Sequence, residues 1–177
     1  KDRRGNLTLT NINGLCRIAL DKLKKTYEQD IQEKNIRIIF DNLTLSLMME
    51  VNVEQFSKVL AGILKNSMYA LLKKSETVTF SPEIFLGLKV NKDMLEITIR
   101  DNGSGIDENI KDKIFAPFFT TKTTGEAAGV GLYLCREIVQ NHRGTIEVES
   151  KKGEYTQFLI TIPVYQPKTI TPPKEEE

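Results

Sequence analysis

Residues 95–106 read Leu-Glu-Ile-Thr-Ile-Arg-Asp-Asn-Gly-Ser-Gly-Ile, an alternating stretch that ends in a carboxylate and two glycines. The apolar residues at every second position predict a strand over Leu95–Arg100. Asp101 then stands at the end of that strand, and Gly103 and Gly105 allow the backbone to approach a flat ligand closely. A carboxylate in this place can accept a hydrogen bond from the exocyclic amine of a purine, although the same residues in isolation are typical of an ordinary turn.

Upstream of this strand, residues 52–71 carry the strongest helical pattern. Asn52-x-x-Gln55 has the form of a capping box, and the apolar residues that follow recur at helical spacing. Asn66 lies among them, with Gly62 one turn earlier on the same line. Taken alone, Asn66 is interpreted either as a core amide bonded to backbone or as an oxygen ligand for Mg²⁺.

The remaining patterns predict helices that alternate irregularly with strands. We expect further helices over residues 12–29 and 130–141, a short helix over 108–113 capped by Asp107, and strands over 36–40, 47–51, 77–80, 84–90, 145–149 and 157–162. The strands at 36–40 and 47–51 are expected to be neighbours, and Lys73-Lys74 is interpreted as a solvated helix end. This order predicts an α+β fold, a two-layer sandwich of one sheet covered by one layer of helices.

Residues 101–129 form a long segment rich in glycine, threonine and asparagine, and a segment of that length in a compact domain is usually functional or disordered. Gly125, Gly129 and Gly131 precede and open the helix expected at 130–141, where free backbone amides can bind phosphate. The cluster does not match the phosphate-binding loop that ends in Gly-Lys-Ser/Thr, because no lysine follows Gly131.

Length and composition describe one ordinary globular domain. The 177 residues carry 25 basic and 24 acidic side chains, and the net charge of +1 disfavours binding to nucleic acid or an anionic membrane. Two cysteines, Cys16 and Cys135, are interpreted as core residues in a reducing compartment. Because the chain does not start with Met, we expect a piece of a longer protein, with residues 1–6 as the end of an upstream linker or helix, 7–164 as the domain and 165–177 as a flexible tail.

Four short motifs occur in a specific order and spacing along the chain. They are the segments around Asn66 and around Asp101, the run Phe115-Ala-Pro-Phe-Phe-Thr-Thr-Lys122, and Gly129-Val-Gly-Leu132. In that order the chain resembles the ATP-binding catalytic domain of bacterial sensor histidine kinases, in the superfamily of gyrase, Hsp90 and MutL. The resemblance spans roughly Leu7 to Val164. It implies the Bergerat-type ATP-binding fold, with one mixed sheet, and a lid over about residues 109–128.

The resemblance also implies a role for each matched residue. Asn66 would hold Mg²⁺ against the triphosphate, Asp101 would bind the adenine amino group, and Lys122 would contact a phosphate, so that Asn66 and Lys122 are the expected catalytic residues. The other implied nucleotide contacts are Gly103, Gly105, Ile106, Phe118, Phe119, Thr120, Thr121, Gly129, Val130, Gly131, Leu132 and Thr156. ATP and Mg²⁺ are therefore the expected cofactors.

Two departures from the family pattern bear on activity. Gly62 stands where ATP-hydrolysing relatives carry a glutamate that activates water, so a general base for hydrolysis is missing. Tyr69 stands where many members have lysine. We therefore expect transfer of the γ-phosphoryl group to a partner histidine, with a nucleotide-gated regulatory module as the alternative and an ATP-driven dimer clamp as a disfavoured third possibility.

His142 is the sole histidine, and its place before Arg143-Gly144 favours a structural role at a helix end over that of a phosphoacceptor. The acceptor is expected on an upstream helical dimerisation domain of the same sensor kinase, with a response regulator receiver domain as the next partner. The resemblance further implies a cytoplasmic location, an isolated domain that is monomeric, and no direct contact of this chain with a membrane.

Overall fold

The structure, a computed structural model, describes residues 2–117, 119 and 131–166. In these residues the elements are β1 (Thr8–Asn11), α1 (Ile12–Thr26), α2 (Glu28–Glu33), β2 (Arg37–Asp41), β3 (Met48–Val51), α3 (Val53–Ser75), β4 (Glu83–Asn91), β5 (Met94–Asp101), the 3-10 turn η1 (Lys111–Lys113), α4 (Leu132–Asn141), β6 (Thr145–Lys151) and β7 (Tyr155–Pro163). None of the helices in these ranges is both long and apolar enough to cross a membrane.

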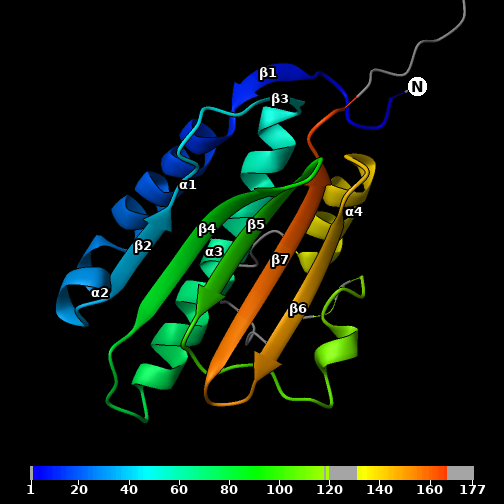
Figure 1. Cartoon of the computed structure of the whole chain (residues 1–177). Helices are drawn as coiled ribbons and strands as arrows, with labels where there is room; N and C mark the ends of the chain where they lie inside the picture. Colours follow the sequence, from blue (N-terminus) through cyan, green and yellow to red (C-terminus); the bar gives the residue numbers. More distant parts are fainter. Residues whose placement is uncertain (1, 118, 120–130, 167–177) are drawn as a thin grey trace, which may run out of the picture.

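The main sheet has five strands in the order β2-β4-β5-β7-β6 (Figure 1). β2 runs parallel to β4, and the other neighbours pair antiparallel. The predicted mixed sheet under one layer of helices is therefore confirmed. β5 is central, and its last residue, Asp101, pairs with Ile84 on β4 and with Thr156 on β7.

One face of the sheet is covered by helices, and α3 lies between α1 and α4 in that layer (Figure 1). The strands alternate in burial because successive side chains point to opposite faces, so the buried positions of β5 and β7 face the helices. α3 places its apolar stripe there and buries Phe56, Leu60 and Ile63 almost completely. Cys16 and Cys135 are free cysteines in this core, as expected from the sequence.

Two strand predictions were wrong. β2 and β3 are not neighbours: β3 pairs antiparallel with β1 in a separate two-stranded sheet, while β2 pairs with β4. The parallel pairing of β2 with β4 requires a long connection, and β3 and α3 together supply it. Residues 77–80, also expected as a strand, form a turn and an irregular segment before β4.

Three helix predictions were imprecise. The helix expected over 12–29 is two helices, because α1 ends at Thr26 and α2 starts at Glu28. The helix expected over 108–113 is only the 3-10 turn η1, although Asp107 does accept a hydrogen bond from the Asn109 amide. α4 starts at Leu132, two residues after the expected position.

Candidate functional site

Asp101 ends β5 on the face of the sheet that the helices cover. The side chain is buried, and its Oδ1 accepts a hydrogen bond of 2.9 Å from the Gly103 amide, which closes a tight turn directly after the strand. Within the described part of the chain it forms no salt bridge. A buried carboxylate without a salt-bridge partner is costly, and such groups are concentrated at functional sites.

The surroundings of Asp101 disfavour its charge. Burial raises the pKa of Asp101 to about 7, although the Gly103 amide, the Ser67 hydroxyl and the charges of Arg100 and Lys74 each act to lower it. At neutral pH the carboxyl group is therefore divided between its protonated and ionised forms. A ligand that donates a hydrogen bond to this oxygen favours the ionised form.

The two glycines after Asp101 permit close backbone contacts. A Cβ atom on Gly103 would lie 2.6 Å from the carbonyl carbon of Ala70 on α3, so the loop can approach the helix only with glycine here. Gly105 has a φ of +66°, and a Cβ there would collide with the carbonyl oxygen of Lys151. The Ser104 amide donates to the Ala70 carbonyl at 3.1 Å and fixes the loop against α3.

α3 brings Asn66 and Ser67 to the same region. Asn66 is half-buried within α3, and its side-chain amide makes no hydrogen bond to any residue that the structure describes. Ser67 is 1% exposed and faces Asp101, yet its hydroxyl forms no hydrogen bond of normal geometry to a described residue. The Ser67 hydroxyl, buried beside a buried carboxylate and without a hydrogen bond of normal geometry, is a group that a polar ligand would satisfy.

Thr156 completes this end of the sheet. It is the cross-strand partner of Asp101, so both side chains lie on the helix-covered face. Its Oγ1 lies 3.0 Å from the Ser150 hydroxyl, which also accepts a hydrogen bond of 2.9 Å from the Ile106 amide. Ser150 thus links Thr156 to the loop that follows β5.

The N-terminus of α4 has the features of an anion site. Gly131 is its N-cap, no side chain in the described part of the chain caps the free amides, and the first turn has no acidic residue. Gly131 is exposed, and Leu132 is half-buried against the core. The uncapped amides leave a partial positive charge at this helix end.

Part of the predicted site lies outside the described residues, namely Phe118, Thr120, Thr121, Lys122, Gly129 and Val130, together with residues 120–128 of the expected lid. Phe119 is described, and its side chain packs against the core. Near it, Phe115 makes an edge-to-face contact with Phe158, with ring centroids 6.3 Å apart. Among the described site residues, Asp101, Gly103, Gly105, Ile106 and Thr156 come together around one end of β5. Asn66 lies on α3 one turn before Ala70, which contacts Gly103.

Sequence reasoning missed three contributors to this region. Ser67 follows Asn66 directly and could have been found from its position in the helical period. Ser150 gave no local signal. Lys74 was expected in solvent, but it is half-buried, and its Nζ donates to the Asn102 carbonyl at 3.0 Å.

The oxygen ligands that the protein offers here suit a cation that is bound mainly by the phosphates of a nucleotide. They do not suit a cation that the protein alone would hold. Within residues 2–117, 119 and 131–166, no three His, Cys, Asp or Glu side chains gather as a metal site. Mg²⁺ commonly takes one or two protein oxygens and completes its shell with phosphate oxygens and water. The unpartnered amide of Asn66 is suited to that single contact.

Residues 52–166 match a family model described as "Histidine kinase-, DNA gyrase B-, and HSP90-like ATPase". The catalytic domain of the histidine kinase ThkA, solved free of nucleotide, is similar with a TM-score of 0.72 and 28% identity, over 89% of this chain and 95% of that one. The match therefore covers nearly the whole of a solved catalytic domain.

Two longer proteins are similar in sequence. The chain is 35% identical to cyanobacterial phytochrome A of a Nostoc species, over 82% of this chain and 18% of that protein. It is 28% identical to the sensor histidine kinase ZraS of Salmonella typhi, over 89% of this chain and 31% of that protein. The chain thus spans less than a third of these relatives.

Proposed function

The chain belongs to the histidine kinase-, DNA gyrase B- and HSP90-like ATPase family, and from this premise we propose that it binds ATP with Mg²⁺ between α3 and α4. We further propose that it donates the γ-phosphoryl group to a histidine on a separate domain of the same sensor kinase. The observation that carries the proposal is the buried carboxylate of Asp101, which forms no salt bridge to a described residue and has the buried Ser67 hydroxyl beside it.

Asp101 binds the adenine amino group in this proposal. The amine donates to the carboxylate oxygen and stabilises the ionised form, which burial otherwise disfavours. Ser67 supplies a second polar contact to the base, directly or through one water molecule. Gly103, Gly105, Ile106 and Thr156 shape the floor of the pocket.

The phosphates lie toward α4. The uncapped amides that begin at Gly131 face the negative charge, and Asn66 holds Mg²⁺. When bound, Mg²⁺ neutralises charge on the phosphate oxygens. Lys122 and the remaining residues of its box, Phe118, Phe119, Thr120 and Thr121, together with Gly129, Val130 and Leu132, are assigned to the nucleotide by resemblance, and residues 109–128 are assigned to the lid.

The proposed reaction is a direct transfer. The bond from the γ-phosphorus to the bridging oxygen breaks, a bond from phosphorus to the acceptor imidazole nitrogen forms, and ADP leaves. The acceptor loses its N–H proton to solvent. Such transfer depends mainly on positioning and charge neutralisation, so the acceptor can belong to another domain.

Water is a poor competitor for the phosphoryl group in this site. Gly62 lies on α3 one turn before Asn66, and it offers no carboxylate that could activate water. Slow hydrolysis preserves ATP for the partner histidine. This supports a kinase over a dimer clamp that is driven by ATP hydrolysis.

A nucleotide-gated regulatory module is the second candidate. Tyr69 favours it, because it stands where many family members have lysine, and its ring lies 6.0 Å from the Lys73 ammonium. Transfer distinguishes the two candidates: with [γ-³²P]ATP, a kinase labels the His-bearing helical domain of its own longer protein. A domain that binds ATP but never labels that partner supports the regulatory module instead.

The proposed partners are that helical dimerisation domain and, after it, a response regulator receiver domain. The proposed compartment is the cytoplasm, where ATP is available and where the free Cys16 and Cys135 stay reduced. His142 is not proposed as the acceptor, because it is 0% exposed at the end of α4.

A further inference from the structure

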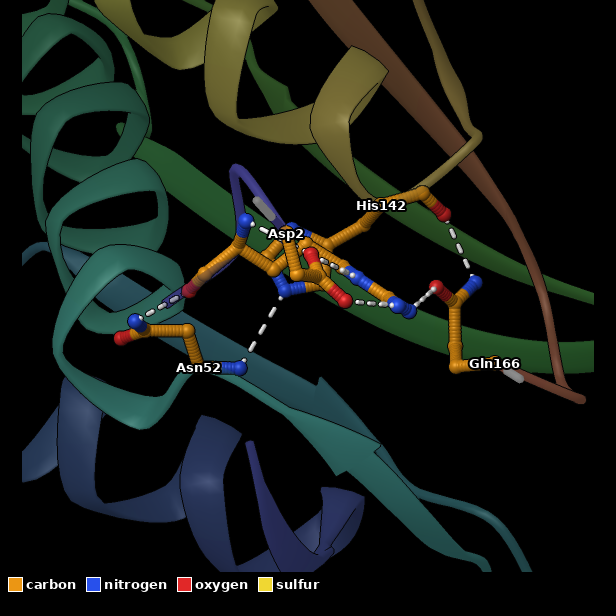
Figure 2. A network of polar contacts seen from close by, with 5 residues as sticks. Asp2, Asn52, His142 and Gln166 are labelled. Atoms are coloured by element: carbon orange, nitrogen blue, oxygen red, sulfur yellow. Dashed lines mark hydrogen bonds and ion pairs between the residues drawn. The ribbon is translucent and has the colours of Figure 1, made fainter. Parts of the chain in front are cut away.

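A buried polar cluster joins four separate segments of the chain at the start of α3 and the end of α4 (Figure 2). We call this cluster the latch, and its members are Asp2, Arg4, Asn52, His142 and Gln166. Sequence reasoning placed residues 1–6 and 165–177 outside the domain. Arg4 and Gln166 are nevertheless buried within it, with exposed fractions of 2% and 4%.

Arg4 is the centre of the latch. Its Nε and Nη2 bind the two carboxylate oxygens of Asp2, and its Nη1 donates to Gln166 Oε1 at 3.1 Å. The planar guanidinium suits this forked arrangement, which a lysine cannot reproduce. The hydrogen bond with Asp2 raises the pKa of Arg4 despite its burial, and the charge of Glu50 on β3 adds to this rise.

Asn52 ties the arm of residues 2–5 to the first turn of α3. As N-cap, its Oδ1 accepts from the Gln55 amide at 3.0 Å, while its Nδ2 donates to the carbonyl of Arg4. In a complete capping box the Gln55 side chain would bind the Asn52 amide. Here that amide donates to His142 Nε2 at 3.2 Å, and Gln55 Oε1 has no partner among the described residues.

His142 ties the same point to the end of α4. Its Nδ1 donates to the Ile138 carbonyl at 2.8 Å, and its ring packs edge-on against Phe56 of α3, with centroids 4.9 Å apart. Burial lowers the pKa of His142, which keeps the ring neutral and Nε2 able to accept. The His142 carbonyl accepts from Gln166 Nε2 at 2.7 Å, so the segment after β7 is held as well.

The latch and the nucleotide pocket share the same two helices. The N-cap of α3, Asn52, belongs to the latch, and α3 also carries Asn66. At a rise of 1.5 Å per residue, Asn66 lies about 21 Å from Asn52 along the helix axis. α4 ends in the latch at His142 and begins at Gly131, in the proposed phosphate site. A change in how the latch holds these helices would therefore reach both halves of the pocket through α3 and α4.

We propose that the docked arm, Asp2–Gly5, is a conformational device that holds α3 and α4 in the arrangement competent for nucleotide. Undocking of the arm loosens the packing of the two helices and weakens the pocket, so the segment that precedes the domain can control the site through Arg4. The role of the latch in helix packing stands on its own contacts. Its effect on nucleotide rests on the proposed function.

Arg4→Gln tests this device, with Arg3→Gln as the matched control because Arg3 is the exposed neighbour. Amide hydrogen exchange of the ligand-free protein is the readout. In R4Q we expect about tenfold faster exchange at the Asn52 and Gly144 amides, which report the latch, and at Cys135 and Ser104, which report the pocket. Amides of Leu86 and Ile99 in the central sheet are the internal control and stay slow.

Two results overturn the proposal. In the first, the pocket amides of R4Q exchange at the same rate as those of the wild type. In the second, exchange of the sheet amides becomes faster by as much as exchange of the pocket amides. The second result would mean general destabilisation. If R4Q does not fold, Gln166→Ala is the milder variant, because it removes only the Gln166 contacts of the latch. We expect the same amides to exchange faster in Q166A, by a smaller factor than in R4Q.

Calorimetric titration with Mg²⁺-ATP tests the effect on nucleotide. We expect R4Q to bind about three- to tenfold more weakly than the wild type, and R3Q to bind as the wild type does. Equal affinity of R4Q and R3Q contradicts the coupling. If the wild type itself binds no ATP, the proposed function fails and the control of nucleotide fails with it, while hydrogen exchange still decides the packing role.

Discussion

Asp101 is the residue on which most of the proposed chemistry depends, and its burial has a measurable consequence for stability. Its pKa of about 7 in the folded protein lies above the ordinary value of 3.8. The folded state therefore binds the proton more tightly than the unfolded state does. This contribution to stability is fully present below about pH 4 and is lost as the pH rises to about 7.

Asp101→Asn should remove this pH dependence in the ligand-free protein. A change in pKa from 3.8 to about 7 corresponds to about 4 kcal/mol as an upper bound. Between pH 4 and pH 8 the free energy of unfolding of the variant should therefore rise by up to that amount relative to the wild type. Urea unfolding at both pH values measures the free energy of unfolding. Asp93→Asn, in the exposed β4–β5 turn, is the control, and a difference for D101N that does not change with pH would contradict the account.

Asp101 also makes nucleotide binding depend on pH. The adenine amine needs the ionised carboxylate, so binding near neutral pH should release a proton and the affinity should increase as the pH rises from 6 toward 8. Calorimetry in buffers of different ionisation enthalpy measures the proton release. Proton uptake would be the opposite of the expected sign.

The Ser67 hydroxyl should affect nucleotide affinity and protein stability in different ways. Its buried hydroxyl has no partner of normal geometry among the described residues, so Ser67→Ala should leave the ligand-free protein as stable as before or more stable by about 1 kcal/mol. ATP affinity should nevertheless fall by about three- to tenfold, because the base loses a polar contact. Ser57→Ala on the first turns of α3 is the control. Unchanged affinity in S67A would remove Ser67 from the site.

Among the elements, the contact between α3 and the loop after β5 decides the shape of the pocket. Gly103→Ala places a methyl group 2.6 Å from the Ala70 backbone and should cost about 2–3 kcal/mol of stability while weakening ATP binding. Gly14→Ala on α1 meets no atom closer than 3.8 Å and should stabilise by about 0.5–1 kcal/mol. Thermal unfolding of both variants tests the contrast, and a G103A protein as stable as G14A would refute it.

The predictions from sequence were accurate where the signal is local. The apolar period identified α3, the alternation identified β5, and the Asn52 cap fell at the correct residue. They failed where the signal is remote: nothing near β2 indicates that its partner is β4, some forty residues later, rather than β3. For the candidate site, the matched boxes gave Asn66 and Asp101, and the helical period could have given Ser67, but Lys74 required knowledge of its burial.

For the whole molecule, the latch shows why some functional candidates have no sequence signature. Its residues come from four segments, and each segment is unremarkable in isolation: an N-terminal arm, a helix cap, a helix end and the residue before a tail. Their association depends on the complete fold, which brings the start of α3 and the end of α4 to the same point.

Every role proposed for the site depends on nucleotide binding at Asp101 and Asn66, which titration calorimetry can test. Titration calorimetry compares the native chain with D101N and with the D93N control, with and without Mg²⁺. We predict binding of ATP that requires Mg²⁺, is lost in D101N and is retained in D93N. The absence of binding by the native chain, or binding by D101N equal to that of the native chain, would contradict the account.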